Sequence, residues 1–146
     1  MIGGKEVKKF LFLNLILLLL FGCSSMLPLS EASLDRAHFI YKDDQILVAS
    51  VPRQLANVGY GFDVLLVNKS DGSMMFGYEE YDFVIHTNDL ERYTKKEMSK
   101  GYFPMDLMPG ESINLIFVAP EDVTPDCEVN YSIFILNGKE YRMEKS

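Results

Sequence analysis

The sequence predicts an all-β domain, an antiparallel β-sandwich with at most one short helix, over residues 37–146. From about His38 onward, short apolar runs alternate with turn-forming residues, which is typical of sandwiches and barrels rather than of βαβ units. This part of the chain holds about 110 residues, enough for one hydrophobic core. A single β domain is therefore expected.

Six runs rich in strand-forming residues are assigned to strands. They are Gln45–Val51, Gly61–Asn68, Tyr81–Thr87, Ser112–Ala119, Tyr131–Leu136 and Lys139–Met143. Asn137-Gly138 joins the last two, and both residue types tolerate the positive φ angles of a type I′ hairpin turn. Asn68–Ser73 and Pro109-Gly110 mark further turns, and Pro52 is expected to end its strand or lie at a sheet edge.

One segment, Asp89–Lys100, departs from the β pattern and predicts a short helix. Asn88 precedes it as an N-cap candidate, Glu91 stands at the capping-box position, and Gly101 follows a basic last turn. The apolar stripe of this helix would consist of Leu90, Tyr93 and Met98.

Several strands are apolar on both faces. In Gly61–Asn68, for example, Val64 and Leu66 alternate with Leu65 and Val67. A strand with two apolar faces needs cover on both, which we expect from Asp89–Lys100 or from an N-terminal strand. A partner-binding surface on an apolar sheet face is the alternative.

Residues 1–22 have the layout of an export signal peptide, because three lysines precede the apolar run Phe10–Phe21. As a helix this run would span roughly 18 Å, against a hydrocarbon core of about 30 Å. An uncleaved signal anchor that extends to Leu27 is the alternative to cleavage.

The signal segment ends in Leu20, Phe21 and Gly22, and these residues together with the following Cys23 resemble the lipobox of bacterial lipoprotein precursors. Phe21 departs from the small or β-branched residue usual there. The resemblance implies cleavage between Gly22 and Cys23, attachment of diacylglycerol to the Cys23 thiol, and often acylation of the new amino group with a fatty acid such as palmitate. Two or three acyl chains would anchor the chain stably, since one chain binds only marginally. A cysteine that merely ends an ordinary signal peptide is the alternative.

Residues 23–36 are then expected to be the lipidated cysteine and a flexible tether, since they are rich in serine and lack a sustained period. The domain would lie outside the cytoplasm, anchored to the cell membrane or outer membrane. Ser24 would suit delivery to the outer membrane in a Gram-negative host.

The mature chain is expected to be strongly acidic. Removal of residues 1–22 takes away three Lys and one Glu, so 11 basic and 20 acidic residues remain and the formal net charge becomes −9. Nucleic acid and anionic lipid headgroups are recognised by Lys and Arg, so neither is an expected partner.

Lipidation of Cys23 leaves Cys127 as the remaining cysteine. We expect Cys127 to be a buried, inert thiol, with intermolecular pairing or a reactive thiol as alternatives.

No enzyme, cofactor or metal centre is predicted, because the sequence lacks a Gly-rich phosphate loop, HExxH, GxSxG and CxxC. His86 is expected on a strand surface, and His38 has no companion at metal-ligand spacing. Two acidic groups are expected to be solvated, with calcium binding as the alternative; they are Glu79, Glu80 and Asp82, and Glu121, Asp122, Asp126 and Glu128. A sugar-stacking platform is a further alternative for Tyr78, Tyr81 and Tyr102.

Roughly residues 38–143 resemble the immunoglobulin-like domains of unknown function found in many bacterial lipoproteins. The segments that carry the resemblance are Val64–Ser70, Leu107–Glu111 and Ile116–Pro120. It implies an immunoglobulin-like sandwich on a lipid tether and supplies no catalytic or binding residues. The Cys and Trp positions of true immunoglobulin domains are absent, which excludes their disulfide.

The expected function is therefore that of a non-enzymatic, membrane-anchored envelope lipoprotein, whose β domain is a protein-interaction or structural accessory module. A ligand-binding module for carbohydrate or calcium is the alternative, and an enzyme with an unrecognised site is the third class.

Overall fold

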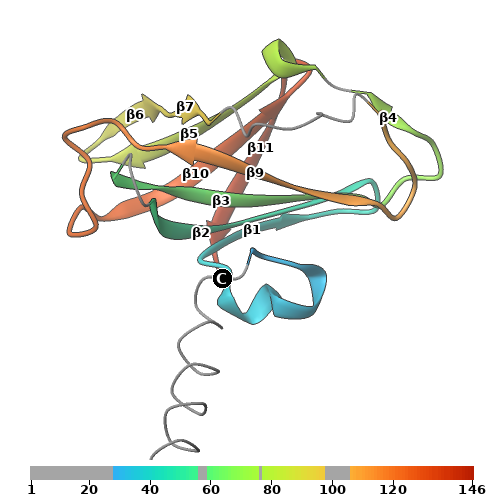
Figure 1. Ribbon diagram of the computed structural model, residues 1–146, viewed down its shortest axis with the longest axis horizontal. Helices are drawn as coiled ribbons and strands as arrows, with labels where there is room; N and C mark the ends of the chain where they lie inside the picture. The colour runs from blue at the N-terminus through green and yellow to red at the C-terminus, as the bar shows by residue number, and fades with distance from the viewer. Residues whose placement is uncertain (1–27, 56–58, 76, 98–105) are drawn as a thin grey trace, which may run out of the picture.

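The computed structural model describes residues 28–55, 59–75, 77–97 and 106–146 (Figure 1). Its helical elements are short 3-10 turns, η2 (Glu31–Arg36) and η3 (Tyr78–Glu80). The strands are β1 (Phe39–Lys42), β2 (Ile46–Leu55), β3 (Gly59–Asn68), β4 (Met74–Met75), β5 (Tyr81–Thr87), β6 (Leu90–Tyr93), β7 (Lys95–Lys96), β8 (Asp106–Leu107), β9 (Ser112–Val118), β10 (Val129–Leu136) and β11 (Lys139–Lys145). The prediction of an all-β antiparallel domain is confirmed.

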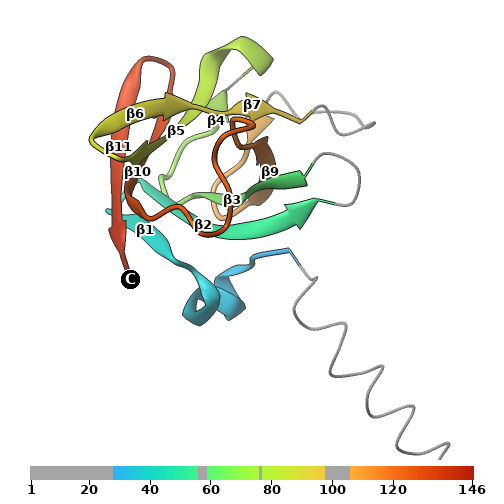
Figure 2. The same cartoon turned by 90° about the vertical axis from the view of Figure 1, so that its left-hand side faces the viewer.

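Nine strands form one antiparallel sheet in the order β6-β5-β10-β11-β1-β2-β3-β9-β7, while β4 and β8 pair separately. The two edge strands, β6 and β7, are consecutive along the chain. The sheet curls so that its two edges come close to each other (Figure 2). Thr94 lies between them, and its N–H and hydroxyl both donate to the carbonyl of Phe83. Glu97 then donates its N–H to Ile116. The chain thus passes from β6, beside β5, to β7, beside β9, and nearly closes the sheet into a barrel.

The immunoglobulin-like sandwich is not confirmed, because the strands do not divide into two separate layers. β1 pairs with β11 through Phe39 and Ile40, and the same strand pairs with β2 along its whole length. β1 therefore joins into one sheet the strands that a sandwich would keep in two.

The predicted helix over Asp89–Lys100 is wrong for residues 89–97, which form β6 and β7; residues 98–100 lie outside the described part of the chain. Asn88 and Asp89 have φ angles of 49° and 63°, and the flanking residues Thr87 and Leu90 pair. These two residues form a tight turn of the type that needs positive φ twice. Asn and Asp favour both helix caps and such turns, which explains the error.

The hairpin predicted at Asn137-Gly138 is confirmed, with φ angles of 50° and 79° between the paired residues Leu136 and Lys139. Pro52 does not end its strand, because β2 continues to Leu55. It lies beyond the last residue of β2 that pairs with β1, which is Ser50, so this half of β2 is an edge, where a missing N–H is tolerated.

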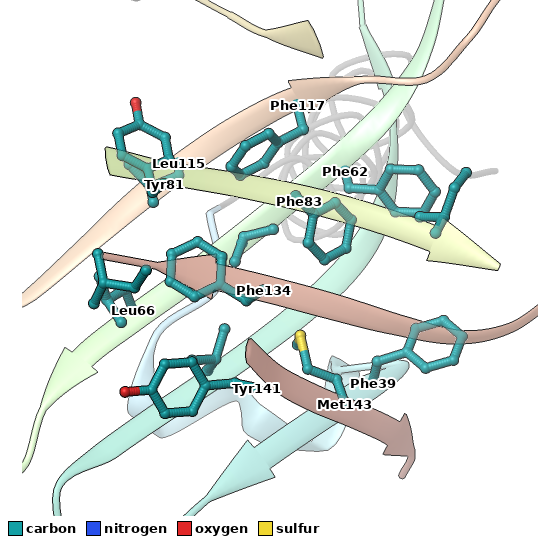
Figure 3. Packing of buried hydrophobic residues seen from close by; sticks show 14 of the residues in the cluster. Phe39, Phe62, Leu66, Tyr81, Phe83, Leu115, Phe117, Phe134, Tyr141 and Met143 are labelled. Atoms are coloured by element: carbon teal, nitrogen blue, oxygen red, sulfur yellow. The ribbon is translucent and has the colours of Figure 1, made fainter. Parts of the chain in front are cut away.

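The interior of the barrel is filled by a single large cluster of apolar side chains (Figure 3). Four fully buried phenylalanines lie at its centre: Phe62, Phe83, Phe117 and Phe134. The ring centroids of Phe62 and Phe83 are 5.4 Å apart, and those of Phe83 and Phe117 are 5.2 Å apart in tilted arrangements. Rings from β3, β5 and β9 therefore pack across the barrel and hold its opposite walls together.

A second apolar cluster covers the outer face of β2 and β3. It contains Leu29, Ala37, Leu47, Ala49, Leu65 and Val67, each at most 3% exposed. The expectation that the second apolar face is covered within the chain is confirmed for these strands. The cover comes from residues 29–37, including η2, and residues 89–97 do not contribute to it. Residues 28–36 are thus packed against the sheet, where a flexible tether was predicted.

Candidate functional site

Gly22 and Cys23, with the rest of residues 1–27, lie outside the described residues, so the signal peptide, cleavage and lipidation stay predictions. The described residues begin with Pro28 and Leu29. Leu29 is 1% exposed, and its backbone N–H donates to Oδ2 of Asp63 at 2.9 Å. The Asn114 side-chain amide donates to the Leu29 carbonyl at 2.8 Å and to Oδ1 of Asp63 at 3.2 Å. Leu29, six positions after the predicted anchor, is therefore tied into the sheet.

The turn that follows is held by its own polar side chains. Ser30 donates its N–H to Oγ of Ser33, and Arg36 donates to the Pro28 carbonyl at 3.2 Å. Lys69, the residue that follows β3, forms a 2.7 Å ion pair with Glu31. Residues 28–36 thus have a defined structure, held by hydrogen bonds within the segment and by an ion pair to the domain.

Two cavities of about 510 and 600 Å³ lie at one end of the barrel and share Tyr60 as a lining residue. The first is lined by Ala37, His38, Phe39, Pro52, Tyr60, Pro125, Cys127, Glu128, Val129, Lys145 and Ser146. The second is lined by Gly59, Tyr60, Lys95, Lys96, Glu97, Val118, Ala119, Pro120, Glu121 and Val123. Among these described lining residues, Tyr60 is the one tyrosine, and the carboxylates are divided between the two cavities.

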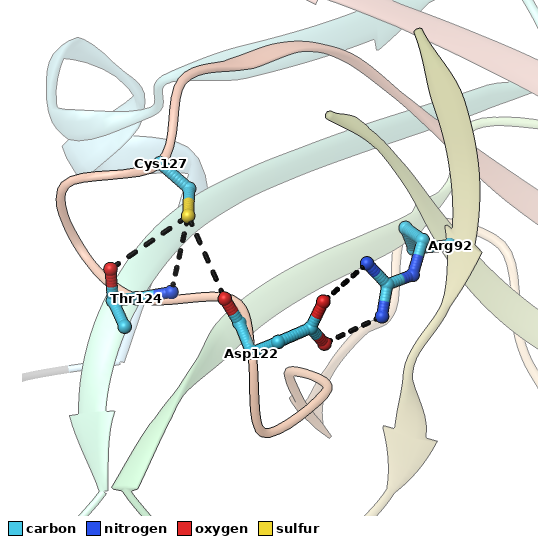
Figure 4. A network of polar contacts seen from close by, with 4 residues as sticks. All are labelled: Arg92, Asp122, Thr124 and Cys127. Carbon is cyan, nitrogen blue, oxygen red and sulfur yellow. Dashed lines mark hydrogen bonds and ion pairs between the residues drawn. The ribbon is translucent and has the colours of Figure 1, made fainter. Parts of the chain in front are cut away.

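Cys127 is half-buried, lines the first cavity and packs against the core, so it is less buried than expected. Figure 4 shows the thiol in the loop after β9, where the Thr124 N–H approaches its Sγ at 3.5 Å. In the same loop, Asp122 accepts two hydrogen bonds from the Arg92 guanidinium, at 2.8 and 2.6 Å. The Arg92 contact holds the pKa of Asp122 below its ordinary value and ties the loop to β6.

Four of the acidic residues considered as calcium ligands each contact a different neighbouring group. Asp82 lies 3.7 Å from Lys96, Asp122 is bound by Arg92, and Glu128 lies 3.3 Å from Lys145. Glu80 accepts the N–H of Gly77. In the described part of the chain, no three His, Cys, Asp or Glu side chains gather in a way that could hold a metal ion.

Two of the three tyrosines considered for sugar stacking face a lysine that sequence reasoning missed. The Nζ of Lys96 lies 4.7 Å from the ring centroids of both Tyr78 and Tyr81, and it donates to the Tyr78 carbonyl. Burial raises the pKa of Tyr81 to about 12. Tyr102 lies outside the described residues. These rings hold β7 near η3 and β5 and do not form an open platform.

His86 lies on the outer face of β5, as expected, and stacks on Tyr131 with ring centroids 4.5 Å apart. The Arg142 guanidinium lies 3.9 Å from the centroid of the same tyrosine, whose hydroxyl donates to Glu91 at 3.3 Å. His38 lies at the first cavity, apart from His86. The two histidines are therefore not brought together.

No helix of the described residues is both long and apolar enough to cross a membrane. Comparison of the chain with protein-family models, with curated proteins and with solved structures found no match.

Proposed function

We propose that this chain is a bacterial envelope lipoprotein of non-enzymatic type, anchored through acyl chains on Cys23, whose β domain is a protein-interaction or structural accessory module. The proposal rests on the order of features along the chain: a basic start, an apolar run, Leu20 to Cys23, and then a domain that is packed from Leu29 onward. The resemblance to immunoglobulin-like domains of bacterial lipoproteins agrees with this proposal but supplies no catalytic or binding residues.

The observation that carries the proposal is the short sequence separation between Cys23 and Leu29, a buried residue of the fold. An ordinary export signal needs no special residue at its end, whereas a lipidated cysteine must be the first residue of the mature chain. Here the buried Leu29 follows Cys23 by six positions, so the cysteine falls just ahead of the domain and not within it.

The interaction role is supported by the edge strand β6. Leu90 and Tyr93 are 60% and 63% exposed, although most large apolar side chains of the described sheet are buried. An edge strand that exposes apolar side chains is a surface to which another chain can add. The alternative of a carbohydrate or calcium module is less favoured, since the described cavity walls hold one tyrosine and separated carboxylates.

Expression of the full chain in bacteria with labelled palmitate tests the anchor. The wild-type chain should take up label and sediment with membranes, while Cys23→Ala should remain an unlabelled, unprocessed precursor. Cys127→Ala is the matched control, because the chain has two cysteines, and it should be labelled like the wild type. Normal processing with release of the unlabelled wild-type chain would refute the proposal.

A further inference from the structure

The distance between the predicted lipid and the fold is limited by covalent geometry. Leu29 follows Cys23 by six positions, and six fully extended residues reach at most about 20 Å. Leu29 itself cannot move away from the sheet without losing its hydrogen bond to Asp63 and its buried contacts with Leu47 and Leu65. The length available between bilayer and domain therefore ends at Leu29.

That length is shorter than the domain is wide. A compact domain of about 100 residues has a radius of gyration of about 13 Å, which corresponds to a diameter of roughly 35 Å. A connection of about 20 Å does not let the domain turn over and place its far side on the bilayer. Whichever side holds Leu29 must stay next to the lipid.

The structure shows which side this is. Residues 28–37, with η2, lie across the outer face of β2 and β3, and Figures 1 and 2 place them below the barrel in both views. β6 forms part of the upper side of the barrel in the same views. The C-terminal Ser146 is on the η2 side, where its N–H donates to the His38 carbonyl.

We propose that the lipid-anchored domain is held within about 20 Å of the membrane surface, with η2 and the covered face of β2 and β3 toward the headgroups and with the β6 edge directed away from the bilayer. This inference rests on the proposed lipidation of Cys23. The charges beside η2 are of both signs, so they give no electrostatic preference for the membrane. The short connection therefore imposes the orientation. The charged residues are Glu31, Asp35, Arg36 and Lys69. The exposed Leu90 and Tyr93 are thereby presented to partners outside the membrane.

Fluorescence quenching on vesicles tests the orientation. In a Cys127→Ser background, Ala32→Cys on η2 and Leu90→Cys on β6 each receive a fluorophore; both positions are exposed. The lipidated proteins are placed in phosphatidylcholine vesicles that contain a headgroup-nitroxide lipid. We expect a several-fold greater loss of fluorescence at position 32 than at position 90. Insertion of about 20 Gly and Ser residues between Ser25 and Met26 should reduce this difference, because such a linker spans about 25 Å on average.

The outcomes separate the two proposals. A chain without attached lipid refutes the proposed function and this inference with it. A lipidated chain whose two probes are quenched equally, or whose quenching ratio is unchanged by the inserted linker, overturns the orientation and leaves the anchor intact.

Discussion

The backbone N–H of Leu29 donates a 2.9 Å hydrogen bond to the carboxylate of Asp63, a residue 34 positions later in the chain. Both residues are at most 2% exposed. A buried carboxylate is costly unless its oxygens are satisfied, and here the partners are the Leu29 N–H and the Asn114 side chain. Asp63 therefore fixes the start of the domain on the outer face of β3.

Replacement of Asp63 by Ala should lower the free energy of unfolding by about 1.5–3 kcal/mol, the usual range for a hydrogen bond to a charged group. The loss leaves the Leu29 N–H and the Asn114 amide without their acceptor. Urea unfolding of the wild-type and variant proteins measures the change. Asp35→Ala, on the exposed part of η2, is the control and should change stability by no more than about 0.5 kcal/mol. Equal effects of the two substitutions would contradict the role of Asp63.

Amide hydrogen exchange at Leu29 gives a second measurement of the same contact. Exchange should be slow in the wild-type domain and much faster in Asp63→Ala, because the N–H would lose its acceptor. Unchanged protection in the variant would show that Leu29 is held by packing alone.

Asn68 joins two turns that the sequence predicts separately. Its side-chain amide donates to the carbonyls of Gly72 and Leu107, and its Oδ1 accepts from the N–H and hydroxyl of Ser70. Asn68→Ala should destabilise the domain by about 1–3 kcal/mol, since buried groups lose their partners. Calorimetric melting measures this.

Ser50→Ala is the matched control for Asn68, because Ser50 is equally buried but its Oγ has no hydrogen-bond partner among the described residues. Removal of this hydroxyl should leave the melting temperature unchanged or raise it. A larger loss at Ser50 than at Asn68 would contradict the assignment of the stabilising contacts to Asn68.

Gly61 is required by close packing at the point where β3 pairs with β9. A Cβ at this position would overlap the Phe117 carbonyl and lie 2.7 Å from the Leu55 Cδ1. Gly61→Ala should destabilise the domain by about 1–3 kcal/mol through this overlap. At Gly72 the same Cβ would meet nothing within 4 Å. Gly72→Ala should therefore be near neutral in chemical unfolding, and a comparable loss there would rule out the steric explanation.

Local chemistry made part of the fold predictable. Asn137-Gly138 defines its hairpin by the φ angles that these residue types tolerate, and the alternating apolar runs identify β3, β5, β9 and β10. Closure of the barrel through Thr94 could not be predicted from the sequence. It depends on a hydrogen bond to the carbonyl of Phe83, and the position of Phe83 is fixed only once the sheet has assembled. Asp63 was missed for the same reason: its partner Leu29 is distant in sequence, within a segment whose serines and proline indicate a tether.

The Arg92 and Asp122 pair should make stability depend on pH in the acid range. Arg92 donates to the Asp122 carboxylate and holds its pKa below the ordinary value of 3.8. A carboxyl whose pKa is lower in the folded chain contributes stability that is present above the unfolded pKa and is lost as pH falls through the folded pKa. The urea midpoint of the wild-type domain should therefore fall more steeply below pH 3.8 than that of Asp122→Asn.

The carboxyl titration of Asp122, followed by NMR, separates this contact from general acid unfolding. In the wild-type domain the midpoint should lie below 3.8, and in Arg92→Gln it should rise toward that value, because the guanidinium donors are gone. The Asp122 side chain is exposed, so high salt should reduce the difference between the two proteins. The same Asp122 midpoint in both proteins at low salt would mean that Arg92 does not stabilise the carboxylate, and β6 would then have to be tied to the loop by other contacts.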